Sequence, residues 1–395
     1  MCTVEVSAVS ERAPARSFVA FAGVFVAALL AFLGVGCVLP VLPRYVHGPL
    51  AAGDVWVGVV TGAFAFTAVV ARPVAGRLAD RHGRRVVVLG GALLVAAAGA
   101  LYFVPAGVPG LLVARLVLGA GEGAVFTAGA TWVVDIAPVA RRGQAIGLFG
   151  LAVWGALSAG PLIGEGLFQA GGYSLVWAFA ALAPLLGAVI AARQPGGGPA
   201  PEPPARGPLV PPEVLRPGIA LALANVGYGA LAGFIVLDLD RLGVGHGAGV
   251  FTAFAAAVVG TRLLLGRLPD RFGGRTTAIA AGVAEAAGLA LLAAAGSLVV
   301  ALAGAVVMGM GFSTLFPSLA LIVVNRTGDD RRGGAVGIFT AFFDIGVWLG
   351  GPLVGAVAAL AGYPAGFWAA AACAALGVGL TTTISRRAGA RPPSG

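Results

Sequence analysis

Charged side chains inside long apolar runs are the best candidates for chemistry in this sequence. Arg115 and Glu122 lie in the apolar run 109–133, and Asp344 lies near the middle of the run 333–358. Arg115 and Glu122 are seven residues apart, so in a helix they share one face about 10 Å apart along the axis. A carboxylate removed from water favours its neutral, protonated form. The chemistry that Glu122 indicates is therefore the uptake and release of a proton.

Other polar residues in apolar runs are weaker candidates. Asp344 has Trp348 one turn further on, and Asn225 and Tyr228 are three residues apart in the run 217–238. Asp344 is a second candidate proton or binding site, and Asn225 and Tyr228 are candidate ligand contacts. The competing interpretation for all of these residues, Glu122 included, is a structural ion pair or a hydrogen bond between neighbouring helices.

A ten-residue segment occurs twice, at residues 76–85 and 266–275. The first copy is Gly-Arg-Leu-Ala-Asp-Arg-His-Gly-Arg-Arg, and the second, 190 positions later, is Gly-Arg-Leu-Pro-Asp-Arg-Phe-Gly-Gly-Arg. The same offset pairs Arg72 with Arg262 and continues through most of each half. A constant offset over this length indicates one architecture used twice.

The composition predicts an all-α membrane protein. The chain is 59% hydrophobic and 10% charged, with a mean hydropathy of +0.97. Runs of about 20 apolar residues predict membrane-spanning helices, because a helix satisfies its own backbone in lipid. We expect twelve spans, at 17–41, 54–75, 86–104, 109–133, 144–168, 173–192, 217–238, 247–265, 276–295, 297–323, 333–358 and 363–384.

These spans divide into two six-helix bundles. We expect an N-terminal arm at 1–16, a bundle at 17–192, a Pro- and Gly-rich linker at 193–216, a bundle at 217–384 and a tail at 385–395. Of the 25 arginines, 20 lie in the arm, the loops after even-numbered spans and the tail. The positive-inside rule then places both termini and the linker in the cytoplasm. We expect the protein to lie in the inner cell membrane.

Several function classes are excluded or disfavoured. The net charge of +9 resides in short loops between spans, which argues against nucleic-acid binding. The chain has no lysine, which excludes a P-loop and a Schiff-base lysine, and its three histidines fall in predicted loops. Three isolated cysteines predict no thiol metal site. We therefore expect no enzyme, no metal and no cofactor.

Three motifs resemble those of the major facilitator superfamily, most closely its twelve-helix proton-coupled drug and metabolite efflux members. Residues 76–85 resemble the superfamily's signature between helices 2 and 3, and residues 115–121 resemble its helix 4 motif. Gly160, Pro161 and Gly164 resemble part of the helix 5 antiporter motif. Ala156 and Glu165 stand where the fuller motif has glycines, which weakens the antiporter assignment.

The resemblance implies a cytoplasmic lock between the bundles. In it, Asp80, Arg84 and Asp135 would form a charge relay, and the alternative is that these charges only fix topology. Asn325 stands at the position equivalent to Asp135, so we expect the first copy to dominate. The residues assigned to the lock are Gly76, Asp80, Gly83, Arg84, Arg85, Asp135, Gly266, Asp270 and Gly273.

The resemblance also implies a central cavity lined by helices 1, 4, 7 and 10. We expect Glu122 to carry a coupled proton, and Arg115 to tune it or to contact the substrate. The predicted function is proton-coupled efflux of a small amphipathic compound by alternating access, with the proton gradient as energy source. The alternatives are an uptake symporter for a sugar or polar metabolite, and a membrane sensor that transports nothing. The oligomeric state stays open, with a monomer favoured.

Overall fold

The computed structural model describes residues 5–138, 141–195, 211–327 and 332–384, and these residues form helices without strands. The helices are α1 (Glu5–Val38), α2 (Leu42–His47), α3 (Asp54–His82), α4 (Arg84–Leu101), α5 (Gly107–Ile136), α6 (Arg142–Ala192), α7 (Pro212–Arg241), α8 (Gly247–Leu265), α9 (Leu268–Phe272), α10 (Gly274–Ala293), α11 (Leu298–Val324), α12 (Arg332–Ala361) and α13 (Tyr363–Thr382).

Twelve segments of the described chain are long and apolar enough to cross a membrane, as the sequence predicts. Eleven continuous stretches meet this criterion, and one of them, Gln144–Ala192, is 49 residues long. This stretch contains two spans, because α6 is interrupted at Gly171 (φ −156°, ψ 19°) and Gly172 (φ 66°, ψ −160°). Glycine suits the second of these positions, because its positive φ is rarely adopted by other residues.

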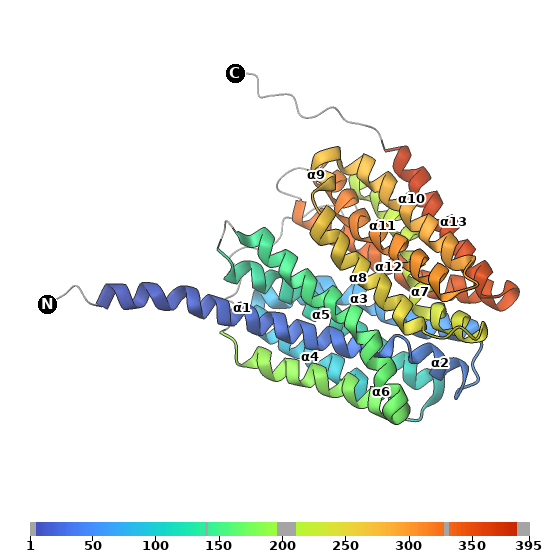
Figure 1. The fold of residues 1–395 in the computed structure, drawn as a ribbon. Coiled ribbons are helices and arrows are strands. Elements are labelled where there is room, and N and C mark those ends of the chain that lie inside the picture. The colour runs from blue at the N-terminus through green and yellow to red at the C-terminus, as the bar shows by residue number, and fades with distance from the viewer. Residues whose placement is uncertain (1–4, 139–140, 196–210, 328–331, 385–395) are drawn as a thin grey trace, which may run out of the picture.

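The spans form two bundles side by side, α1–α6 and α7–α13 (Figure 1). Arg85 at the start of α4 donates to the Gln194 carbonyl just past α6, and Arg275 at the start of α10 donates to the Thr382 carbonyl at the end of α13. We call the face that holds these helix ends the terminal face. The opposite face holds α2 and the first residues of α3 and α8.

The two bundles repeat the same close helix contacts. A Cβ on Gly119 of α5 would lie 2.6 Å from the Phe64 carbonyl carbon of α3, and one on Gly309 of α11 would lie 2.5 Å from the Phe254 carbonyl oxygen of α8. Each residue of the second pair lies 190 positions after its counterpart in the first. The 190-residue offset in the sequence therefore also relates equivalent helix contacts in the two bundles.

Some element bounds differ from the predicted ones. The expectation of a loop over residues 76–85 is wrong for most of its length, because α3 continues through His82 and only Gly83 (φ 90°) separates it from α4. Residues with good helix propensity, such as Arg77, Leu78 and Ala79, carry the helix past its apolar part. In the second half, Gly273 (φ 82°) makes the equivalent turn. Helix α1 begins at Glu5 and α7 at Pro212, both before the expected spans.

Adjacent glycines on α4 give a test of this packing. A Cβ on Gly91 would lie 2.8 Å from the Gly121 carbonyl oxygen and 2.9 Å from Ala124 Cβ, whereas one on Gly90 would meet nothing within 4 Å. We expect Gly91→Ala to lower the free energy of unfolding in detergent by roughly 1–3 kcal/mol, because it overpacks the α4–α5 contact. The matched control Gly90→Ala should leave it unchanged or raise it slightly. Equal effects would contradict the packing.

Candidate functional site

A cluster of one arginine and two carboxylates lies between the two bundles. Arg72 of α3 donates from Nε to Asp344 Oδ2 (2.7 Å) and from Nη2 to Asp344 Oδ1 (3.1 Å). Glu122 of α5 approaches the same guanidinium less closely, with 3.8 Å between Glu122 Oε1 and Arg72 Nη2. Because Asp344 is on α12, the tight pair joins the bundles, whereas Glu122 belongs to the same bundle as Arg72.

This charge cluster is buried. Asp344 is 2% exposed and Glu122 9% exposed, and the Arg72 guanidinium lies over the Phe126 ring, 4.8 Å from its centroid. Two polar atoms of the cluster, Glu122 Oε2 and Arg72 Nη1, have no hydrogen-bond partner among the described residues. Buried polar groups are normally paired, so such orphans point to a site that changes its partners.

Sequence reasoning identified both carboxylates of the cluster but missed its cation. Arg72 lies ten residues before the end of α3 and directly precedes Pro73, which is inside the helix. The signal was available, because Arg72 and Arg262 occupy equivalent positions of the repeat. The pairing of Arg72 with Asp344, 272 residues away, depends on how the bundles dock and was not visible in the sequence.

Arg115 is placed away from the two carboxylates. It is 0% exposed, donates to the carbonyls of Val60 (3.1 Å) and Thr61 (2.6 Å) of α3, and lies 4.7 Å from the centroid of the Phe64 ring. The structure thus does not bring Arg115 to Glu122. It fastens α5 to α3, the two helices that carry Glu122 and Arg72.

Tyr228 of α7 belongs to an aromatic cluster beside the charge cluster. Its ring centroid lies 6.5 Å from Trp154 of α6, 6.0 Å from Phe254 of α8 and 5.8 Å from Phe312 of α11. Asn225, one turn earlier, is buried and donates to the Leu221 carbonyl of its own helix (2.8 Å). Tyr228 therefore lies among rings of both bundles, and we call the region of this aromatic cluster the central region. The Asn225 amide, in contrast, is bound within α7.

The bundles separate towards the terminal face between α6 and α8. Ser158 of α6 and Thr252 of α8 exchange hydrogen bonds, with Thr252 Oγ1 donating to the Ser158 carbonyl at 2.8 Å. Nearer the terminal face, a cavity of about 310 Å³ opens between the same helices and is lined by Leu151, Trp154 and Arg262 among others. A second cavity of about 280 Å³ adjoins Arg262 from the side of α11.

The predicted lock residues of the first half do meet at the terminal face. Arg84 Nη1 lies 3.1 Å from Asp80 Oδ1, and Arg84 Nε donates to Asp135 Oδ2 at 3.0 Å. All three residues belong to the first bundle, and Arg84 also donates to the Ala79 carbonyl (2.8 Å). In the second half Asp270 is exposed on α9, and Gly266 and Gly273 flank that helix. Gly76 lies inside α3.

The helix 5 motif residues serve helix packing. A Cβ on Gly160 would lie 2.7 Å from the Gly36 Cα of α1, and one on Gly164 would meet the Cys37 backbone. Pro161, between these glycines, is inside α6. The motif thus allows α1 and the first span of α6 to approach closely.

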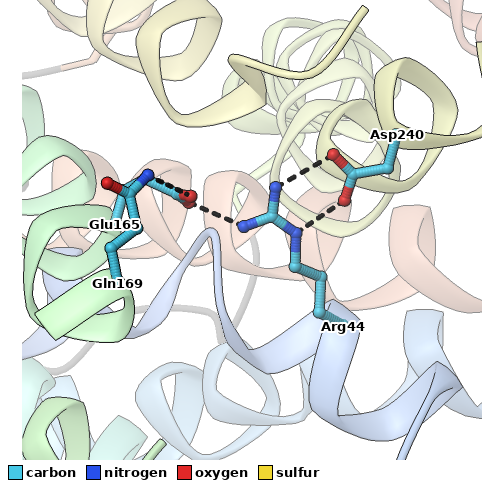
Figure 2. A network of polar contacts seen from close by, with 4 residues as sticks. All are labelled: Arg44, Glu165, Gln169 and Asp240. Atoms are coloured by element: carbon cyan, nitrogen blue, oxygen red, sulfur yellow. Dashed lines mark hydrogen bonds and ion pairs between the residues drawn. The ribbon is translucent and has the colours of Figure 1, made fainter. Parts of the chain in front are cut away.

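An ion network closes the opposite face, and sequence reasoning did not predict it. Arg44 of α2 donates from Nε to Asp240 Oδ2 (2.6 Å) and from Nη2 to Asp240 Oδ1 (2.9 Å), and its Nη1 donates to Glu165 Oε2 (2.6 Å). Figure 2 shows the Arg44 guanidinium between the two acids, with Gln169 beside Glu165. Asp240 is on α7, so the Arg44–Asp240 pair joins the bundles, whereas the Arg44–Glu165 pair lies within the first.

Asp240→Asn is expected to favour opening of the opposite face. The pair it weakens is partly exposed and should contribute about 1 kcal/mol, so the open population should rise roughly fivefold. Val55 of α3 and Leu360 of α12 are exposed near this face, one in each bundle. Spin labels at Val55→Cys and Leu360→Cys, in a background without native cysteines, should show a larger long-distance population by pulsed electron paramagnetic resonance.

Glu165→Gln is the matched control for this measurement. It weakens an ion pair of the same arginine with the same 2.6 Å separation, but within one bundle. The distance distribution should therefore stay close to that of the unchanged chain. Equal broadening in both variants would show that the Arg44–Asp240 pair does not hold the bundles together.

Comparisons with known proteins agree with this architecture. A family model described as Major Facilitator Superfamily matches residues 24–249 and 218–394. An uncharacterized MFS-type transporter of Salmonella typhimurium is 33% identical over 369 residues, which cover 91% of this chain and 95% of the relative. YhhS of Escherichia coli (strain K12), also named an uncharacterized MFS-type transporter, is 31% identical over 370 residues and 90% of each chain.

Solved structures share the fold at lower identity. The nucleoside transporter NupG superposes with a TM-score of 0.79 at 14% identity, over 92% of this chain and 99% of its own. The human organic anion transporter TETRAN superposes with a TM-score of 0.69 at 18% identity, over 92% and 99%. At these identities the likeness concerns the fold alone.

Proposed function

The chain belongs to the major facilitator superfamily and is a multi-pass membrane transporter, and from this premise we propose that it exports a small amphipathic compound in exchange for protons. The observation that carries the proposal is the buried cluster of Arg72, Glu122 and Asp344 between the bundles. An alternating-access transporter moves its bundles relative to each other around a central site. A titratable cluster at that interface couples proton binding to the motion.

The charge balance of the cluster favours one bound proton. Arg72 carries one positive charge, so the cluster has one excess negative charge when both carboxylates are ionised. Burying an uncompensated charge is costly, and one proton removes the excess. Asp344 is fixed by two hydrogen bonds from Arg72, whereas Glu122 Oε1 lies 3.8 Å away, beyond hydrogen-bond range. We therefore assign the exchangeable proton to Glu122.

The arrangement of contacts gives the proton a role in the cycle. The Arg44–Asp240 pair closes the opposite face, while a cavity lies open between α6 and α8 towards the terminal face. We infer from the arginine-rich loops that the terminal face is the cytoplasmic one. When Glu122 loses its proton to the cytoplasm, it competes with Asp344 for Arg72, and this weakens the pair that joins the bundles.

Two further assignments follow from the contacts. Arg115 positions Glu122 by fastening α5 to the backbone of α3, rather than by touching the substrate. Asp80, Arg84 and Asp135 form the charge relay of the lock. In this conformation the relay lies within one bundle, and it becomes a lock between the bundles when the terminal face closes.

The proposed substrate class rests on the aromatic cluster of the central region. Trp154, Tyr228, Phe254 and Phe312 present aromatic rings from four different helices. One of these rings, Trp154, lines the cavity between α6 and α8. Aromatic side chains favour a substrate with an apolar body, whereas a sugar requires several hydrogen-bonding side chains. Asn225 offers few such bonds, since its amide nitrogen binds its own helix.

Growth protection tests the proposed direction of transport. Cells that express the chain, its Glu122→Gln variant or neither are challenged with a panel of toxic amphipathic compounds. We expect the unchanged chain to protect against some of them and the variant not to do so. Everted vesicles should then take up the same compounds on acidification of their lumen. Increased sensitivity of the expressing cells, with uptake into right-side-out vesicles, would instead indicate the uptake symporter.

A further inference from the structure

Arg262 occupies the position in the second bundle that Arg72 occupies in the first, but its surroundings differ. The 190-residue offset pairs Glu122 with Phe312 and Asp344 with Trp154. The two carboxylates around Arg72 are therefore replaced by two aromatic rings, whose centroids lie 5.3 Å apart. The cation is thus present in both halves of the repeat, whereas its carboxylate counter-ions in the first half correspond to aromatic residues in the second.

No partner for the Arg262 guanidinium is present in the described part of the chain. It makes no hydrogen bond, ion pair or cation–π contact there, and Gly150 of α6 faces it, with 3.4 Å between a Cβ built on that glycine and Arg262 Nη1. Arg262 is half-buried and lines both cavities near the terminal face. Neither cavity is lined by an acid. An arginine cannot shed its charge, and no acid of the described residues supplies its counter-charge.

The residues around Arg262 indicate which kind of ligand supplies its counter-charge. On one side lie Leu151, Trp154 and Val258, which are apolar, and on the other side lie Ser313 and Thr314. Arginine binds carboxylates, and tetrahedral oxyanions such as phosphate, through two parallel hydrogen bonds. Aromatic faces bind flat apolar bodies. We propose that Arg262 binds the carboxylate or sulfonate group of an amphipathic organic anion, whose apolar body packs against Trp154.

This inference rests on the proposed function and names the substrate class of the same central region. The cavities lie towards the terminal face, so the anion enters from the cytoplasm. Export of an anion and entry of a proton both move positive charge inwards, so an inside-negative membrane potential drives both steps. The charged head is thus held at Arg262, whereas the coupled proton is held at Glu122, beside the equivalent Arg72 of the first bundle.

Binding to the purified full-length chain tests the proposal without a proton gradient. The probes are 2-naphthalenesulfonate and its neutral analogue 2-naphthalenesulfonamide, measured by isothermal titration calorimetry in a neutral detergent. We expect the sulfonate to bind roughly tenfold or more tightly than the sulfonamide, the effect of a charge-assisted hydrogen bond. Arg262→Gln should remove that difference, and Arg262→Lys should keep part of it. Trp154→Ala should weaken both probes.

The matched control is Arg267→Gln, which removes an exposed arginine five residues after Arg262, past the end of α8 and outside both cavity linings. It should leave both affinities unchanged. Thermal unfolding monitors folding, and Arg262→Gln should not lower the melting temperature because it removes an unpaired charge. Equal affinity for the two probes, or unchanged sulfonate binding in Arg262→Gln, would overturn the proposal.

Two comparisons separate this proposal from its competitors. The titration is repeated in nanodiscs with and without phosphatidylglycerol, which distinguishes a soluble anion from a lipid phosphate as the ligand. Loss of sulfonate binding only in the presence of the anionic lipid would assign the site to lipid and overturn the proposal. Glu122→Gln should still bind the sulfonate. In the unchanged chain, sulfonate binding without any proton coupling would count against the proposed function alone. Proton-coupled export of neutral compounds without Arg262-dependent binding would count against this inference alone.

Discussion

Glu122→Gln is expected to abolish transport driven by a pH gradient while leaving solute exchange intact. Glutamine has the size and neutral charge of a protonated glutamate, so the variant resembles a chain with its proton permanently bound. Exchange of solute for solute across the membrane requires no net proton movement and should continue. Net transport requires the proton to leave at one face and return at the other, and should stop.

The measurement uses proteoliposomes and a compound selected by the growth screen. Net uptake is driven by an imposed pH gradient, and exchange is measured without a gradient at equal solute concentrations. Glu285→Gln is the control, since it replaces another buried carboxyl group, on α10, away from the charge cluster. Unchanged pH-driven transport in Glu122→Gln, or equal losses in both variants, would contradict the assignment of the proton.

Arg72→Gln is expected to be the most destabilising single change in the charge cluster. It leaves Glu122 and Asp344 buried without their shared cation, and removing one partner of a buried ion pair costs about 3–5 kcal/mol. The free energy of unfolding in detergent should fall accordingly. Arg77→Gln, on the exposed part of the same helix, is the control and should change it by less than about 1 kcal/mol.

A double-mutant cycle separates the ion pair from the size of the side chain. Asp344→Asn alone leaves Arg72 with Glu122 as its remaining acid, so we expect a smaller loss. The double variant Arg72→Gln with Asp344→Asn restores charge balance and should recover part of the stability lost in Arg72→Gln. A double variant whose losses are purely additive would show that Arg72 and Asp344 do not stabilise each other.

The fold was largely predictable because the bilayer sets the length of each span. Apolar runs of about 20 residues and the 190-residue register predicted twelve spans in two bundles, and the repeated contacts of Gly119 and Gly309 follow the same register. Helix ends were less predictable. Helix α3 continues past its apolar part to His82, because its polar residues still favour a helix.

The candidate site was predictable only in part. Glu122 and Asp344 were identifiable because a charge inside a span is costly and needs a reason. Their shared partner Arg72 was overlooked despite its repeated position, because an arginine near the end of a span also fits a role in topology. Pairs between the bundles, such as Arg44 with Asp240 across 196 residues, depend on how two finished bundles dock and leave no local pattern in the sequence.

The most direct test of proton-coupled export is the direction in which protons move when solute moves. Proteoliposomes that contain the chain and an internal pH indicator are exposed to an outward gradient of a compound from the growth screen, with membrane potential clamped. We predict that solute efflux acidifies the lumen, because protons enter as solute leaves, and that Glu122→Gln abolishes this acidification. Solute efflux without any change in internal pH, or with alkalinisation of the lumen, would contradict the account.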